Sequence, residues 1–221
     1  GVTEYYCQTS LGYAQLKDSV NPDKPYLYVM AFDQKALSES SIKLKEGRMP
    51  QNSNEVVISE HIESNARVKL NIGDTIKANV GERVIKGTTD KLNQHNPYLE
   101  GNENNPEEKV EEEIINNVAK EYTIVGIIER PNIEIEPYSA PGYSVITLLD
   151  DSNMNANNPI DILVKFKNIK ETYDDTKEIS KQLSQGSSSV NSELLRWSGV
   201  VRNEGTLQMM YGLVGIVMGI I

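Results

Sequence analysis

The segment Gly47-Arg48-Met49-Pro50-Gln51-Asn52-Ser53-Asn54-Glu55-Val56-Val57-Ile58-Ser59 joins a turn to a buried strand and to the start of a helix. Its glycine and proline end the element before them, and the apolar run that follows has the length of a strand. The final serine and Glu60 then predict a helix that carries Ile62 and Val68. The segment therefore indicates a fold that mixes strands and helices.

Strands and helices alternate on both sides of this segment. Asp33 is predicted to cap a short helix that runs through Ser38, and Ser192 to start a last helix. The middle of the chain is rich in strands, which predicts an α+β unit split in sequence by an inserted β-rich subdomain. Strands are predicted at 26–32, from about Thr75 onward, at 121–128, 143–149 and 160–166, and a longer helix at 172–183.

Charge and composition exclude several classes of protein. A net charge of −10 at pH 7 argues against binding to nucleic acid, because a polyanion would be repelled. Cys7 is the only cysteine of the chain, which excludes an internal disulfide and a cysteine-rich metal site. Hydrophobic residues make up 38% and aromatic residues 6%, which suits two thin layered subdomains better than one thick core.

Residues 86–120 are rich in Asn, Glu, Gly and Pro and hold few large apolar side chains. We predict a long acidic insertion here, partly helical near 110–118. Its acidic run, 100–113, is either a site for a cation or a basic peptide, or a solvated face or loop. The second interpretation is favoured, because such runs are usually solvated and the loop spacing of an EF-hand is absent.

The run at 205–221 contains no charged residue and stays apolar to its last position. It predicts the start of a transmembrane helix, since about 20 apolar residues span a bilayer. A buried helix of a water-soluble protein is the alternative, but its three glycines would cost roughly 1 kcal/mol each in water and favour close packing in lipid. The glycines expected to pack in the membrane are Gly212, Gly215 and Gly219, and the residues expected at its boundary are Arg196, Trp197, Arg202 and Tyr211.

A search for reactive groups finds no pattern typical of catalysis. His61, predicted on an exposed helix, has no second ligand at metal-binding spacing, and His95 is predicted in a loop. The sequence contains no Walker A motif, no dinucleotide fingerprint and no nucleophile elbow. We therefore expect no enzymatic activity in this chain, no cofactor and no bound metal.

Three segments, in this order, resemble the MacB-like periplasmic core domain of FtsX-like ABC transporter permeases. The opening segment is similar to the GR-P…NEIVIS motif of these extracellular domains. Leu70-Asn71-Ile72-Gly73-Asp74-Thr75-Ile76 resembles their L-x-x-G-D-T-I step, and Glu121-Tyr122-Thr123-Ile124-Val125-Gly126-Ile127 resembles their F-x-V-V-G-I strand. The resemblance extends over about 26–221. The residues expected to shape its turns are Gly47, Gly73, Asp74 and Gly126.

The resemblance implies a two-part extracellular domain held between membrane helices. A porter-like α+β subdomain is expected at 1–50 and 150–190. A sabre-like β-rich subdomain is expected to be inserted at 51–149, with the acidic insertion at about 86–120. A juxtamembrane helix at 191–204 and the start of a transmembrane helix at 205–221 would follow.

The same resemblance implies a function in the cell membrane, with this domain on the extracellular side. The domain would relay ATP-driven motion of membrane helices to a peptide, lipid or lipoprotein, in export, in extraction or in resistance to antimicrobial peptides. ATP hydrolysis is expected on a separate cytoplasmic subunit, with the permease as a homodimer or heterodimer. Frequent Asn, Lys, Ile and Glu favour a Gram-positive source of low GC content.

Two other functions remain open at this point. The domain is alternatively an extracellular docking or sensing module for a protein partner, such as a cell-wall hydrolase or an antimicrobial peptide, and its acidic charge would steer cationic peptides toward it. A membrane-anchored adhesin with a single span is the other alternative. A groove with exposed apolar walls would favour the transport function, and a flat binding patch would favour docking.

Overall fold

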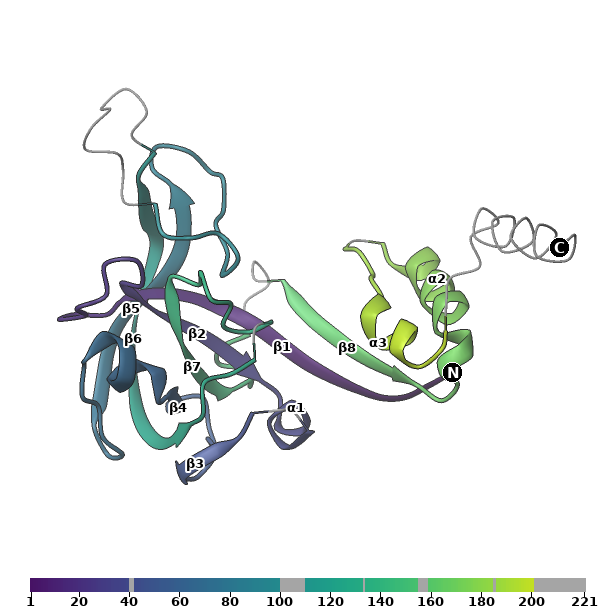
Figure 1. Ribbon diagram of the computed structural model, residues 1–221, viewed down its shortest axis with the longest axis horizontal. Helices are drawn as coiled ribbons and strands as arrows, with labels where there is room; N and C mark the ends of the chain where they lie inside the picture. The colour runs from purple at the N-terminus through teal and green to yellow at the C-terminus, as the bar shows by residue number, and fades with distance from the viewer. Residues whose placement is uncertain (40–41, 100–109, 133, 155–158, 185, 201–221) are drawn as a thin grey trace, which may run out of the picture. The chain divides into compact units, whose positions relative to one another are not determined.

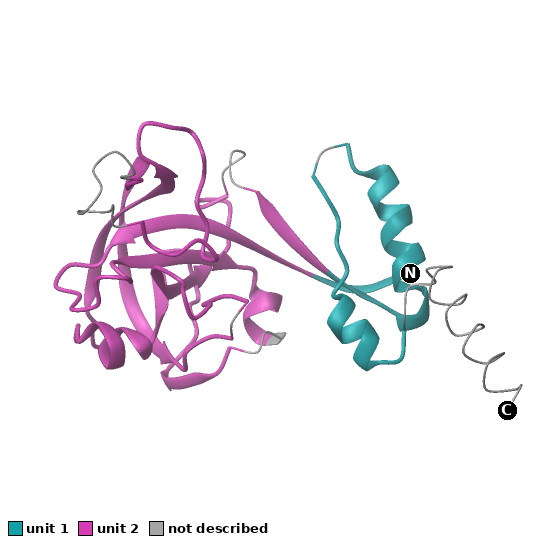
Figure 2. Ribbon diagram, turned by 45° about the horizontal axis from the view of Figure 1, so that its top comes forward, with its two compact units in different colours: residues 1–5, 164–221 teal, residues 6–163 magenta. Residues whose placement is uncertain are grey.

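The computed structural model describes residues 1–39, 42–99, 110–132, 134–154, 159–184 and 186–200. The chain forms two compact units: unit 1 comprises Gly1–Tyr5 and Val164–Ile221, and unit 2 comprises Tyr6–Leu163 (Figures 1 and 2). Unit 2 is therefore inserted in the sequence of unit 1.

Six strands form a closed barrel. Their order is β2–β7–β4–β6–β5–β1, and β1 pairs back with β2, which completes the ring. The pairs β2–β7 and β4–β6 are parallel and the other pairs of the ring are antiparallel, so the sheet is mixed. Outside the ring, β3 pairs with β6 and β8 neighbours β1. The strands are β1 (Val2–Gln15), β2 (Tyr26–Phe32), β3 (Leu44–Gly47), β4 (Glu55–Ser59), β5 (Thr75–Ile85), β6 (Glu112–Ile128), β7 (Gly142–Leu148) and β8 (Ile160–Phe166).

Two hydrophobic clusters line the two faces of the barrel wall, because successive residues of a strand point to opposite faces. On β4, Val56 and Ile58 belong to the inner cluster, to which each of the six barrel strands contributes. Val57, between them, belongs to the outer cluster. The helix α1 (Gln34–Glu39) packs on this outer cluster through Ala36 and Leu37.

The two short helical segments of unit 2 are set by local hydrogen bonds and backbone angles. Asp33 Oδ1 accepts a hydrogen bond from the Ala36 N–H at 2.6 Å, which confirms the predicted cap of α1. The predicted helix after Ser59 is shorter than expected. It is one π-helical turn, Ile62–Ala66, because Arg67 adopts a left-handed conformation (φ 59°) and ends it before Val68.

In unit 1 the first residues of the chain are hydrogen bonded to residues 165 and 167, at the end of β8. The Lys167 N–H donates to the Gly1 carbonyl at 3.0 Å, and the Thr3 hydroxyl donates to the Lys165 carbonyl at 3.0 Å. A 3-10 turn (Ile169–Glu171) then leads into α2 (Thr172–Gln182), and α3 (Ser192–Trp197) follows. α2 ends one residue before the predicted 183, and α3 begins at Ser192 as predicted but ends at Trp197, so it is shorter than the juxtamembrane helix expected at 191–204.

The structure corrects the prediction of a partly helical insertion. β5 and β6 pair from Thr75↔Thr123 as far as Ile85↔Glu112, so residues 112–118 are strand and not helix. Residues 113–119 are half-buried or exposed, which leaves no apolar alternation by which the sequence could mark this strand. Residues 100–109, most of the acidic run, lie outside the described residues.

The division into units also differs from the predicted one. The units separate at residues 5/6 and 163/164, not near 50 and 150, because β2 pairs with β7 from Tyr26↔Gly142 to Phe32↔Leu148 and so shares its barrel. The α+β class, with a large mixed sheet, is confirmed. The names porter-like and sabre-like stay predictions. In the described part of the chain, no helix is long and apolar enough to cross a membrane.

Candidate functional site

Two of the predicted turn glycines lie opposite each other where β3 meets β6. Gly47 pairs in register with Gly126. A Cβ atom on Gly47, which has a φ of +79°, would lie 2.3 Å from the Val125 carbonyl oxygen, and one on Gly126 would lie 2.5 Å from that of Arg48. Both positions therefore need glycine to let the two backbones approach.

The other predicted turn residues lie against the same stretch of β6. Gly73 has a left-handed φ of +94°, and its N–H donates to the Ile124 carbonyl at 2.8 Å. Asp74 Oδ2 accepts from the Asn71 N–H at 2.7 Å and closes the turn. The three segments that carry the sequence resemblance thus meet around residues 124–126. Their contacts there are backbone contacts that shape turns, and none of them involves a reactive group.

The residues predicted at the membrane boundary are described only in part. Trp197, on α3, is 87% exposed. Arg196 is also exposed and lies 2.6 Å from Glu193. The remaining predicted membrane residues lie outside the described residues: Arg202, Tyr211, Gly212, Gly215 and Gly219.

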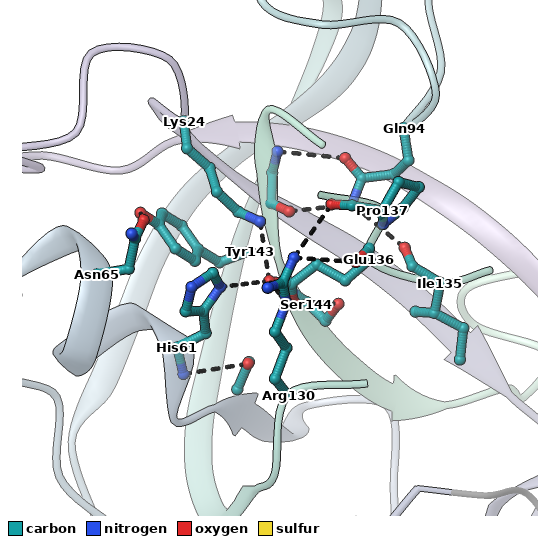
Figure 3. A network of polar contacts seen from close by, with 12 residues as sticks. Lys24, His61, Asn65, Gln94, Arg130, Ile135, Glu136, Pro137, Tyr143 and Ser144 are labelled. Carbon is teal, nitrogen blue, oxygen red and sulfur yellow. Dashed lines mark hydrogen bonds and ion pairs between the residues drawn. The ribbon is translucent and has the colours of Figure 1, made fainter. Parts of the chain in front are cut away.

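A buried polar network surrounds Glu136, and it was not predicted from the sequence (Figure 3). Glu136 Oε1 accepts from Lys24 Nζ and lies 2.8 Å from His61 Nδ1, with Arg130 Nε at 3.5 Å. Glu136 Oε2 accepts from the backbone N–H and the hydroxyl of Ser144, at 3.1 and 2.9 Å. Both carboxylate oxygens are therefore occupied.

The network joins four separate parts of unit 2. Lys24 precedes β2, His61 precedes the π-helical turn, and Ser144 lies on β7. Arg130 also donates to the carbonyls of Glu136 and Pro137 at 3.3 Å, so it holds the loop that carries the carboxylate. This loop is anchored to the barrel mainly by charge-assisted hydrogen bonds.

The partners of Glu136 keep it ionised inside the protein. Burial by itself raises the pKa of the Glu136 carboxyl, but the hydrogen bond from His61 and the charge of Lys24 outweigh burial and lower the pKa to about 2. Burial lowers the pKa of the Lys24 ammonium, and Glu136 offsets part of that effect. A buried ion pair such as this one is stable only while both charges are present, because a single charge inside the protein would have neither a partner nor water to solvate it.

We expect this network to weaken in acid. The pKa of Glu136 is about 2 in the folded chain against 4.5 for an ordinary glutamate, so its contribution is complete above pH 4.5 and is lost as the pH falls toward 2. The difference between the free energies of unfolding of wild type and Glu136→Gln should shrink by about 3 kcal/mol over this interval. Urea unfolding at a series of pH values measures it, and a difference that does not change with pH would contradict the assignment.

The same geometry decides what the network can do chemically. Glu136 is fully buried and saturated with donors, whereas acid–base catalysis needs a group that a substrate can reach. His61, predicted on an exposed helix, instead points its ring into the network, with its side chain 19% exposed. Among the residues that the structure describes, no three His, Cys, Asp or Glu side chains are placed to hold a metal. The arrangement is that of a structural anchor.

A second buried ion pair joins β5 to the start of β6. The Arg83 guanidinium donates to both oxygens of Glu112, at 2.8 and 2.6 Å, and both side chains are completely buried. It also stacks on the ring of Tyr13, 5.0 Å from its centroid. This ion pair was not predicted from the sequence, because Glu112 falls in the segment predicted as an acidic insertion and not in a predicted strand.

Unit 2 also contains an open cavity of about 670 Å³. Apolar side chains from three barrel strands line it (Leu11, Val80 and Val118), and Val118 is 56% exposed. Glu82 and Lys91, which form an ion pair, also line it. The cavity therefore offers both apolar and charged surface to a bound molecule.

Comparison with known proteins gives likenesses of structure alone. No protein-family model and no curated protein matches this chain. It is similar in structure to the extracellular domain of the noncanonic ABC-type transporter YknZ from Gram-positive bacteria (8% identity, 83% of this chain and 75% of that one, TM-score 0.45). It is also similar to a domain of a Porphyromonas gingivalis protein classed as a permease (10% identity, 84% of this chain and 66% of that one, TM-score 0.43).

Proposed function

We propose that this chain is the extracellular domain of an ABC transporter permease, which relays ATP-driven motion of membrane helices to an external substrate. The observation that carries the proposal is the way the chain passes between its two units. Both passages fall inside strands, between Tyr5 and Tyr6 in β1 and between Leu163 and Val164 in β8. A force on unit 1 would therefore be transmitted to unit 2 through extended β-strands and not through connecting loops.

Two features of unit 1 support a position next to a membrane. The first residues of the chain are hydrogen bonded there to residues 165 and 167, so the beginning of the chain and the segment that leads into α2 and α3 belong to one unit, which suits a domain inserted between two membrane helices. α3 exposes Trp197 and Leu194, 87% and 56%, just before the apolar run at 205–221. Trp and Arg are enriched where a helix enters the lipid headgroups.

The cavity of unit 2 supports a substrate with apolar and polar parts, such as a peptide, a lipid or a lipoprotein. Its walls include the exposed apolar residues Val118 and Met154. Exposed apolar walls of this kind favour the transport function over the docking function. In this function the domain has no catalytic group of its own. A cytoplasmic ATP-binding subunit hydrolyses ATP, and two permeases assemble in the cell membrane.

Cysteine labelling in intact cells tests this placement. Tyr138, 85% exposed, is replaced by cysteine in a Cys7→Ser background of the full-length protein, and a membrane-impermeant maleimide is added. We expect labelling without lysis, and no labelling of the matched control Ala31→Cys, since Ala31 is completely buried. Labelling only after lysis would contradict an extracellular position.

Purification of the tagged full-length protein tests the transport assignment separately. An ATP-binding subunit should copurify with it, and the ATPase activity of the complex should respond to variants in β1 or β8. An extracellular protein that copurifies with no ATPase would instead support the docking or sensing module.

A further inference from the structure

In the part of the chain that the structure describes, β8 lies at an edge of the sheet, with β1 as its one strand neighbour. Three of its apolar side chains are exposed: Ile160 by 41%, Ile162 by 60% and Leu163 by 48%. An edge strand with exposed apolar side chains is a template for pairing with another strand.

Three hydrogen bonds, one within β8 and one directly on either side of it, show which backbone groups of this segment face β1. The Lys167 N–H donates to Gly1, the Lys165 carbonyl accepts from the Thr3 hydroxyl, and the Pro159 carbonyl accepts from the Thr9 hydroxyl, at 2.8–3.0 Å. All three positions are odd-numbered. Backbone groups alternate in direction along an antiparallel strand, so the even-numbered residues 160–166 present theirs at the free edge.

The sequence of β8, Ile160-Asp161-Ile162-Leu163-Val164-Lys165-Phe166, is self-complementary about its central residue. Asp161 and Lys165 lie at equal distances on either side of Leu163. One face of the strand carries apolar side chains at all four even positions. A second β8 running in the opposite direction would therefore meet its own complement.

We propose that two copies of this chain pair edge to edge through β8, antiparallel, with the two-fold axis at Leu163. Asp161 then lies opposite Lys165 of the partner subunit, and Ile162 opposite Val164 of the partner subunit. The outward backbone groups of Ile162 and Val164 form the hydrogen-bonded pair next to the axis. The interface is isologous, as a closed dimer requires.

Charge distinguishes this register from its neighbours. Registers centred on Asp161 or on Lys165 also match the backbone pattern, but they place two like charges directly opposite each other. Registers centred on Ile162 or on Val164 match it as well, but Asp161 then no longer faces Lys165 of the partner subunit. Opposite charges across an antiparallel pair stabilise it by roughly 0.2–1 kcal/mol, and like charges destabilise it. Lys165 already contacts Glu4 on β1 at 3.2 Å, so its ammonium would lie between two carboxylates.

Disulfide crosslinking tests the register in the full-length protein. Leu163→Cys in a Cys7→Ser background should form a dimer under mild oxidation, because identical residues at the axis face each other in a non-hydrogen-bonded pair. In the control Ile160→Cys, the two cysteines are offset by six residues, roughly 20 Å along the strand, and should not crosslink. No dimer from Leu163→Cys, or equal yields from both variants, would overturn the proposal.

A charge exchange provides a second test within the Leu163→Cys protein. Asp161→Lys should reduce the rate of crosslinking severalfold, because each lysine then faces Lys165 of the partner subunit. Adding Lys165→Asp restores the complementary pair and should restore the rate. A rate that stays unchanged in the single variant, or stays low in the double variant, would contradict the charge pairing. The outcome does not depend on the proposed transport function.

Discussion

Replacing Glu136 by glutamine is expected to lower the free energy of unfolding by about 3–5 kcal/mol, because it leaves a buried cation without its counter-charge. The Lys24 side chain is 5% exposed and bonds to Glu136 Oε1 at 2.8 Å. His61 and Arg130 lose the same acceptor in part. Urea unfolding at pH 7 measures the change, with circular dichroism to confirm that the variant still folds.

Two controls separate this effect from a general cost of removing a charge. The exposed pair between Lys45 and Glu60 is the matched comparison, and Glu60→Gln should cost at most about 1 kcal/mol. In the buried network, the double variant Lys24→Met, Glu136→Gln should lose less than the sum of the single variants, since neither charge is then left alone. Equal costs for Glu60→Gln and Glu136→Gln would contradict a buried ion pair.

Most strands could be predicted from the sequence, because each has a local signal. The strands 26–32 and 160–166 have the predicted bounds, and Glu55–Ser59 follows its turn as expected. The helix predicted at 172–183 is one residue shorter. These elements are marked by short apolar runs between turn residues, and such runs do not depend on distant parts of the chain.

The closure of the barrel and its polar network could not be predicted in this way. Periodicity marks a strand but not its neighbours, so nothing in residues 8–15 indicates that they pair with Tyr26–Phe32 and close a ring. Glu136 lies in a proline-containing loop, 112 residues from Lys24. A single charged residue in such a loop is usually solvated, and its burial depends on partners that only the folded chain supplies.

Replacing Arg83 by methionine is also expected to destabilise the fold by about 3–5 kcal/mol. Methionine fills most of the volume but leaves the buried Glu112 carboxylate without its bidentate partner. Arg83 also donates to the carbonyls of Asn93 at 3.0 Å and of Asn96 and Pro97 at 3.4 Å. The loop that follows β5 should therefore loosen as the protein as a whole becomes less stable.

Arg83→Lys distinguishes the charge from the shape of the guanidinium. Lysine keeps the positive charge beside Glu112 but cannot bond to both of its oxygens and to the loop carbonyls at once. We therefore expect an intermediate loss of stability, with faster amide exchange at Leu92, whose N–H bonds to the Arg83 carbonyl, and at Leu99, whose N–H bonds to Glu112. Methionine should speed exchange at both positions further. The prediction would be contradicted if the free energy of unfolding of both variants stayed within about 1 kcal/mol of the wild-type value. Glu112 would then reach water when Arg83 is changed, and the ion pair would not be what holds β6 to this loop.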